Sequence, residues 1–200
     1  MPKPSKRLKG TEVFLNLPYE GSCENVLLGL TGALVALKCI PRLTFEEADD
    51  GVGRMQRIFR LLKECPVSLH DLSIVADEPR LNMPFELGLA CAIREMGGKH
   101  RYFILESKRH RLGKALSDLA GWDPKIHNGR LQGAVSVVLE MLRSPGSAIN
   151  ATEVIRLCKA MQRALPAIFA RHKKKSLFNA SVFGDLVIYG WTKADEMGLH

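Results

Sequence analysis

Short apolar runs and longer segments with helical spacing follow one another along most of the chain. Runs typical of buried strands are residues 12–17, 39–43, 68–75, 101–106 and a short one at 125–127. Helical spacing is found at 24–37, 54–65, 112–119, 131–142 and in the segment that Pro84 opens. This alternation predicts an α/β fold, with a parallel sheet covered by helices on both faces.

Two details of the pattern place elements within this sheet. The helix at 24–37 is apolar on nearly every side, so we expect it to be pressed against the sheet, with Gly29 and Gly32 allowing close approach. Ser22 is the expected N-cap of that helix. Pro41 has no backbone N–H to donate, which favours an edge position for the strand that contains it.

The chain changes character after the sequence SPGS at residues 144–147. A long helical segment begins at Thr152 and reaches about His172, with Pro166 expected to kink or break it. The tail after it is also helical in pattern. We expect it to dock through Phe183, Ile188 and Trp191 on its own domain or on a second copy of the chain. The predicted organisation is a basic arm at 1–10, an α/β domain at 11–146 and a helical C-terminal extension at 147–200.

Composition limits the classes of function. With 46% apolar residues, 200 residues suffice for one well-buried α/β domain and a helical appendage. A formal net charge of +8 favours a polyanionic partner or an anionic ligand. The five cysteines lie singly, as is typical of reduced core thiols in a cytosolic protein, and the six histidines lack metal-ligand spacing, so no metal is expected. Neither a signal peptide nor an apolar run of roughly 18 residues is found, so we expect a cytoplasmic protein without membrane contact.

Two acidic residues stand out in the middle of the chain. Asp71 ends a predicted buried strand, and Glu86 lies in the first turn of a mostly buried helix opened by Pro84. We expect both carboxylates to face one crevice at the carboxyl edge of the sheet. Structural roles compete with this interpretation, because the helix dipole favours a glutamate at a helix start and an aspartate often caps a loop.

Three stretches carry a resemblance to a known superfamily: VFLNLPYEGS at the first strand, HDLS at the third, and above all NMPFELGLACA around Glu86. Over residues 12–142 the chain resembles the superfamily that joins nucleoside 2-deoxyribosyltransferases and Toll/interleukin-1-receptor (TIR) domains, and it looks like bacterial members without an assigned substrate. The resemblance implies a flavodoxin-like fold with five parallel strands in the order 2-1-3-4-5. The Trp-Cys signature of many TIR domains is absent, and the C-terminal extension belongs to neither pattern.

The resemblance also implies roles. Glu86 matches the nucleophile of the deoxyribosyltransferases and the glutamate with which TIR enzymes cleave the nicotinamide–ribose bond of NAD. Asp71 matches an acidic residue near the ribose. The candidate substrate-binding residues are Asn16, Tyr19, Ser22, Arg54 and Asn82. Among these, Tyr19 is equally well interpreted as an ordinary loop aromatic and Arg54 as part of a solvated helix face, whereas a helix-start arginine also suits a phosphate.

The leading hypothesis is an N-glycosidase or transferase that acts on NAD or a nucleoside (mono)phosphate, in the manner of a bacterial defence effector. The nucleotide is then the substrate, no cofactor is needed, and a homo-oligomer is expected. One alternative is a non-catalytic module that senses a nucleotide and assembles with a partner. A further alternative is a nucleic-acid-binding protein that uses the basic surface at 156–175, although that run lacks interleaved aromatic residues.

Overall fold

The computed structural model describes residues 9–46, 53–73, 82–109 and 122–200. Five parallel strands form one sheet in the order β2-β1-β3-β4-β5, which confirms the flavodoxin-like α/β fold. The strands are β1 (Thr11–Asn16), β2 (Cys39–Arg42), β3 (Val67–Asp71), β4 (Arg101–Glu106) and β5 (Lys125–Ile126). Pro41 lies in β2, which is an edge strand as expected. The helix predicted at 112–119 and the basic arm up to residue 8 lie outside the described residues.

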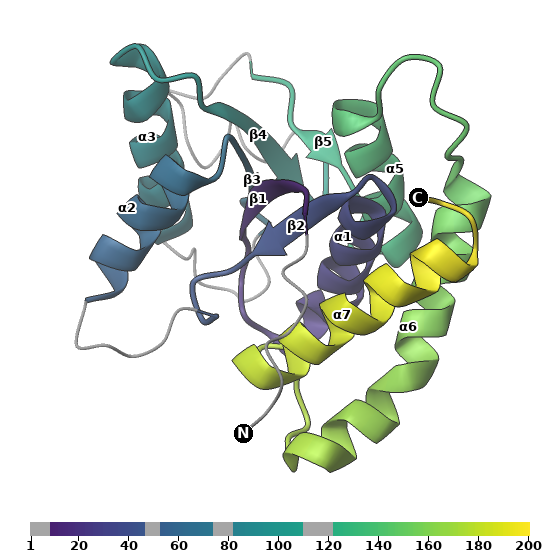
Figure 1. The fold of residues 1–200 in the computed structure, drawn as a ribbon. Helices are drawn as coiled ribbons and strands as arrows, with labels where there is room; N and C mark the ends of the chain where they lie inside the picture. The colour runs from purple at the N-terminus through teal and green to yellow at the C-terminus, as the bar shows by residue number, and fades with distance from the viewer. Residues whose placement is uncertain (1–8, 47–52, 74–81, 110–121) are drawn as a thin grey trace.

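Helices cover both faces of the sheet (Figure 1). On one face lie α1 (Glu24–Ala36), preceded by the short helix η1 (Gly21–Cys23), and α5 (Leu131–Leu142). On the other lie α2 (Arg54–Glu64) and α3 (Asn82–Glu95). The alternation of side chains along β1 divides the core accordingly: Val13 and Leu15 pack with α1, and Phe14 packs with α2.

Helix α1 is apolar all round because neighbours surround it. The sheet lies on one side, and α5, α6 (Ala151–His172) and α7 (Ala180–Glu196) lie on the others. A Cβ atom on Gly29 would lie 2.5 Å from the carbonyl oxygen of Leu131, and one on Gly32 would lie 2.3 Å from Sγ of Cys158. Both glycines therefore allow close helix approach, as expected.

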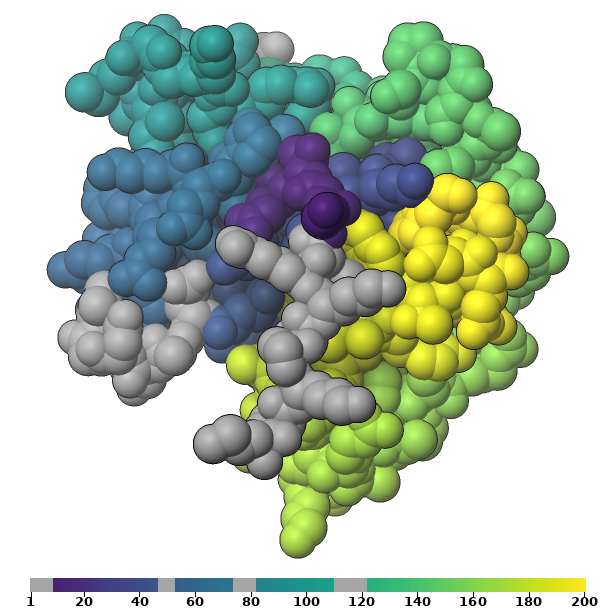
Figure 2. Space-filling view, in the orientation of Figure 1, coloured from purple at the N-terminus to yellow at the C-terminus, as the bar shows by residue number. Residues whose placement is uncertain are grey.

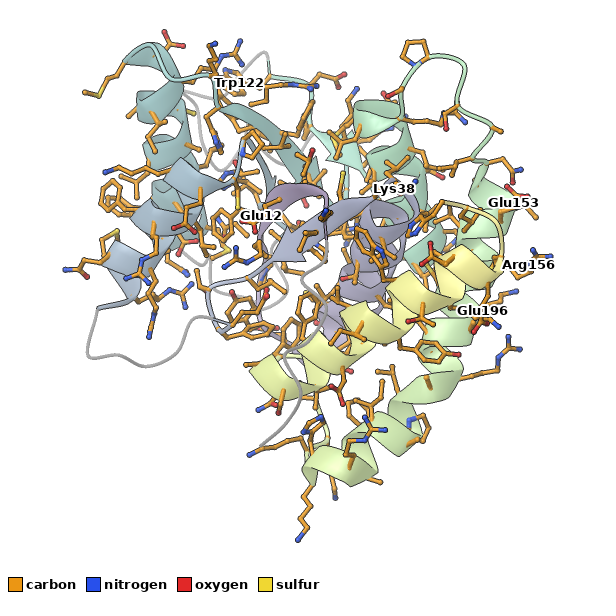
Figure 3. All side chains as sticks on the ribbon, in the orientation of Figure 1. Glu12, Lys38, Trp122, Glu153, Arg156 and Glu196 are labelled. Atoms are coloured by element: carbon orange, nitrogen blue, oxygen red, sulfur yellow. The ribbon has the colours of Figure 1, made fainter. Side chains whose placement is uncertain are left out.

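The C-terminal extension packs onto the α/β layers and shares their apolar core. Helices α6 and α7 pack against each other and against α1, and Figure 2 shows α7 alongside the start of β1. Figure 3 labels Glu153 on α6 and Glu196 on α7. Phe183 is buried and Trp191 packs against the core, so the docking predicted for these two residues is confirmed. The same prediction is wrong for Ile188 on its own domain, because it is 48% exposed.

Two local expectations are corrected. Ser22 is not an N-cap: it lies exposed in η1, and the N-cap of α1 is Cys23, without a side-chain hydrogen bond. The first turn of α1 instead uses Glu24, whose carboxylate accepts hydrogen bonds from Ser176 and from the backbone N–H of Leu177. Pro166 does not break α6, which runs continuously to His172. In the described parts of the chain, no helix is long and apolar enough to cross a membrane.

Candidate functional site

Glu86 is a buried carboxylate with an incomplete set of partners. Its side chain is 2% exposed, and Oε1 lies 3.1 Å from a guanidinium nitrogen of Arg54. Oε2 is buried and has no hydrogen-bond partner among the described residues. Burial raises the pKa of the Glu86 carboxyl group, while Arg54 and a hydrogen bond from Asn82 act in the opposite direction. Helix dipole effects alone do not require this burial, because a helix-start glutamate gains them at the surface as well.

Arg54 joins Glu86 to the loop after β1. It is the first residue of α2, follows the N-cap Gly53 and is about half exposed at the side chain. Its guanidinium carbon lies 5.7 Å from the centroid of the Tyr19 ring. The Tyr19 hydroxyl group shares a hydrogen bond with the Thr44 side chain, and burial raises the pKa of this phenol. Arg54 therefore contacts both Glu86 and Tyr19 and is still exposed enough to bind an anion from solution.

Aromatic side chains of the C-terminal extension support this site. The Tyr19 ring lies 5.3 Å from Phe178 and 5.2 Å from Phe45, measured between centroids. Phe45 in turn packs edge-on against Phe183 of α7. The extension thus holds the Tyr19 ring in position, directly through Phe178 and indirectly through the contact of Phe183 with Phe45.

The three residues that touch come from three successive crossover loops. Tyr19 follows β1, Arg54 begins the helix after β2, and Glu86 lies at the start of the helix after β3. All of them therefore lie at the carboxyl edge of the sheet. The strand order changes direction between β1 and β3, and ligands of open parallel sheets bind outside the carboxyl ends at such a point.

Asp71 belongs to a different cluster. Its Oδ1 accepts a hydrogen bond from the backbone N–H of Ser73, and its Oδ2 lies 3.3 Å from Nε2 of His127. The Ser73 hydroxyl oxygen is also 3.3 Å from that nitrogen. Nδ1 of His127 accepts from the N–H of Gly129, so Nε2 of the neutral ring carries the proton and faces the Ser73 hydroxyl group. Oδ2 of Asp71, like Oε2 of Glu86, has no hydrogen-bond partner among the described residues.

The two carboxylates predicted to share a crevice lie on different faces of the sheet. Side chains alternate along β3, so Asp71 has the same direction as Val67 and Leu69, which pack in the core with α1. Glu86 lies on α3, on the opposite face. Among the described residues no contact joins the two carboxylates, so the shared crevice is not formed by them directly, and the catalytic roles of both stay predictions.

Asn16 does lie on the Glu86 side of the sheet. It shares the direction of Phe14, and its Nδ2 donates to Nδ1 of His70 at 3.0 Å. Asn82 is exposed at the start of α3, and its hydrogen bond to Glu86 acts to lower the pKa of that carboxyl group. Its substrate-binding role stays a prediction. Ser22 is exposed in η1 and no contact joins it to Glu86 in the described structure.

Sequence reasoning missed His127 and Ser73. Each directly follows or closely follows a strand end, and parallel strands end at one edge, so their positions carried a signal. A lone histidine after a two-residue strand gave no indication of its partner, however. No group of three or more potential metal ligands is found in the described residues.

A comparison with models of known protein families gives no match, and a comparison with curated proteins gives none either. The resemblance to the deoxyribosyltransferase and TIR superfamily therefore rests on the three stretches of sequence named above. What the geometry adds is a class of site: a buried carboxylate, a half-exposed arginine and an aromatic ring at the switch point of a doubly wound sheet.

Proposed function

We propose that the protein is a nucleotide-processing N-glycosidase or transferase, a member of the deoxyribosyltransferase and TIR superfamily that acts in the cytoplasm. It cleaves the bond between a base and its ribose in NAD or a nucleoside (mono)phosphate. The observation that carries the proposal is Oε2 of Glu86, a buried carboxylate oxygen at the carboxyl edge of the sheet that has no hydrogen-bond partner in the described part of the chain. Most buried polar atoms in proteins have a partner, so an exception calls for an explanation such as a ligand.

Cleavage of an N-glycosidic bond passes through a state with positive charge on the sugar ring carbon and oxygen. A carboxylate fixed beside that carbon stabilises the charge or forms a covalent bond to it. The group must be ionised to do either. Arg54 favours the ionised form of Glu86, which opposes the effect of burial on its pKa.

Arg54 has a second role in the proposal. Its side chain is 46% exposed, so part of the guanidinium remains open to a phosphate group of the substrate. Tyr19 lies beside Arg54, and Asn16 ends β1 on the face that carries Glu86; both would contact the sugar or the base. Asp71 keeps its proposed role near the ribose only on the strength of the resemblance, because its contacts are to Ser73 and His127 on the other face.

The test is incubation of the full chain with NAD and a panel of nucleosides and nucleotides, followed by chromatographic detection of released base. We expect release from at least one phosphate-bearing substrate. Glu86→Gln, prepared in the same way, controls for a contaminating hydrolase. Binding of a nucleotide without release of base would favour the nucleotide-sensing module instead. If the protein neither binds nor cleaves any compound of the panel, the proposal is wrong.

A further inference from the structure

A second polar site lies at the opposite edge of the sheet from Glu86. The last turn of α3 and the beginning of β4 border an open cavity of about 340 Å³. Arg94, Lys99 and Arg101 line it, and none of its lining residues is acidic. Figure 3 labels Trp122 on this side of the molecule, far from the C-terminal helices.

The three cations of this cavity have no carboxylate partner among the residues that the structure describes. Other basic side chains do form ion pairs, such as Lys125 with Glu140 and Arg171 with Asp185. No ion pair or hydrogen bond to a carboxylate involves Arg94, Lys99 or Arg101 in the described parts of the chain. Three positive charges without a carboxylate partner among the described residues thus border one cavity, Arg94 beside Tyr102 and Arg101 beside Phe103.

Aromatic rings hold two of these side chains in place. The guanidinium carbon of Arg94 lies 5.6 Å from the centroid of the Tyr102 ring, and that of Arg101 lies 5.3 Å from the Phe103 ring. Trp122 stacks on Tyr102 at 5.6 Å with an interplanar angle of 17°. A cation–π contact uses none of the hydrogen-bond donors of a guanidinium group, so the N–H groups of both arginines remain available to an anion.

The backbone turn that brings the cations together is also fixed. Gly97 has a φ of 87°, which favours glycine, and the N–H of Gly98 bonds to the carbonyl oxygen of Ile93. A Cβ atom on Gly98 would lie 2.5 Å from that oxygen. The tight end of α3 therefore brings Lys99 and the start of β4 to the cavity that Arg94 also lines.

We propose that this cavity, which we call the amino-edge pocket (Arg94, Lys99, Arg101, Tyr102 and Phe103), binds a small molecule with two or more linked phosphate groups. A single phosphate group carries a charge of about −1.5 to −2, less than three cations neutralise, so a diphosphate fits better. A cavity of about 340 Å³ suits a small ligand rather than a polymer. The site is separate from Glu86 and does not depend on the proposed reaction.

Two features next to the amino-edge pocket, His100 and the C-terminal end of α3, do not contribute to anion binding. His100 lines its floor and is 5% exposed, but Nδ1 bonds to the carbonyl oxygen of Cys65 and Nε2 to the Ser68 hydroxyl group, so neither ring nitrogen is free for a ligand. The C-terminal end of α3 carries about half a negative charge, which opposes anion binding. Three full positive charges outweigh it, and its last carbonyl groups are capped by Gly97 and Gly98.

Calorimetric titration of the full chain with inorganic pyrophosphate at fixed ionic strength tests the proposal. We expect saturable binding that is tighter than binding of orthophosphate. Arg94→Gln, Lys99→Gln and Arg101→Gln should each weaken it about tenfold or more, as expected for loss of one charge-assisted hydrogen bond. All three side chains are exposed, so melting temperatures should stay close to that of the parent.

Matched variants separate this pocket from other sources of binding. Arg163→Gln removes the same charge from an exposed position of α6, and Arg54→Gln and Glu86→Gln alter only the carboxyl-edge site. All three should bind pyrophosphate normally. Loss of pyrophosphate binding in Arg54→Gln would show that the diphosphate binds at the Glu86 site and would contradict the proposal. An equal loss in Arg163→Gln would show that binding depends only on net charge.

Absence of saturable binding by the parent chain would overturn the proposal as well. Tight binding of a short single-stranded oligonucleotide without binding of pyrophosphate would do the same, in favour of a polymer. Base release does not enter any of these outcomes, so failure of the pocket and failure of the proposed reaction are distinguishable.

Discussion

Two buried polar groups lie on the α2/α3 face of the sheet, and they differ in whether their hydrogen bonds are complete. The first is a chain in which Asn16 donates to His70, His70 to Ser68 and Ser68 to His100, and His100 donates to the carbonyl oxygen of Cys65. Only this direction satisfies every atom, because a carbonyl group can only accept. The second is Glu86, where Oε2 has no hydrogen-bond partner within the described ranges.

The difference separates a structural polar group from a candidate functional one. In the chain, burial lowers the pKa of His70 to about 3 and lowers that of His100 as well, so both rings stay neutral and need no counter-ion. Glu86 is buried as deeply, yet it keeps a half-exposed arginine as its ion-pair partner and one bare oxygen. The hydrogen bonds of Ser68, His70 and His100 are complete within the fold, whereas Oε2 of Glu86 is the atom on which the proposed function rests.

The largest expected effect comes from removing the charge of Glu86. Glu86→Gln preserves the shape of the side chain, so base release should fall on the order of 100-fold or more, about 3 kcal/mol of barrier. The melting temperature should change little. Base release and thermal unfolding are measured on the same preparation.

Glu95→Gln is the matched control, since Glu95 is an exposed glutamate on the same helix. It should leave base release unchanged. Full activity in Glu86→Gln would exclude Glu86 from the mechanism. Its Oε2 would then be a structural feature, like the hydrogen-bonded residues Asn16, His70, Ser68 and His100.

Sequence patterns predicted the fold well because each strand of a doubly wound sheet is a compact apolar signal. The runs that became β1, β3 and β4 stand between clear turns, and Pro41 marked the edge strand. The strand order came from the resemblance. Exposure of Ile188 was not predictable, because the run around it is apolar on consecutive positions and shows no face until α7 is docked.

The candidate site was predicted in part. Tyr19, Arg54 and Glu86 follow successive strands, so parallel order brings them to one edge, where the structure joins them. The face of the sheet was harder to predict. Asp71 ends its strand one residue after His70, and that single step places it on the α1 side, beside His127.

The second largest effect should come from breaking the satisfied chain. Ser68→Ala removes one hydroxyl group and leaves Nε2 of both His70 and His100 without a partner. Since an unsatisfied buried group costs about 1–3 kcal/mol, the free energy of unfolding should fall by about 2 kcal/mol. Urea unfolding measures it. Ser136→Ala, at an exposed position of α5, is the control and should change stability by less than about 0.5 kcal/mol.

A third test uses pH. His70 has a pKa of about 3 in the folded chain, against 6.5 for an ordinary histidine, so between these values the unfolded chain binds one more proton. The free energy of unfolding should therefore decrease as the pH falls from 6.5 toward 3, by up to about 1.4 kcal/mol per unit from this residue. Glu86 has the opposite sign, because its folded pKa is raised. If the free energy of unfolding of His70→Gln has the same pH dependence as that of the parent, the conclusion that His70 is buried as a neutral ring would be wrong.

The smallest effect on stability, and the most specific one on activity, is expected from Arg54→Gln. Because Arg54 is 46% exposed, loss of its ion pair should change the free energy of unfolding by less than about 1 kcal/mol. Arg54 lowers the pKa of Glu86, so without it that pKa rises further, and the acid limb of the pH–rate profile should move to higher pH. Lys63→Gln, at the exposed end of the same helix, should leave the acid limb of the pH–rate profile unchanged.

If Arg54 also binds the substrate phosphate, KM should rise for nucleotides and not for the matching nucleosides. A pH profile and KM values equal to those of the parent would leave Glu86 without its proposed electrostatic partner, and the contrast with the histidine chain would then rest on the bare oxygen alone.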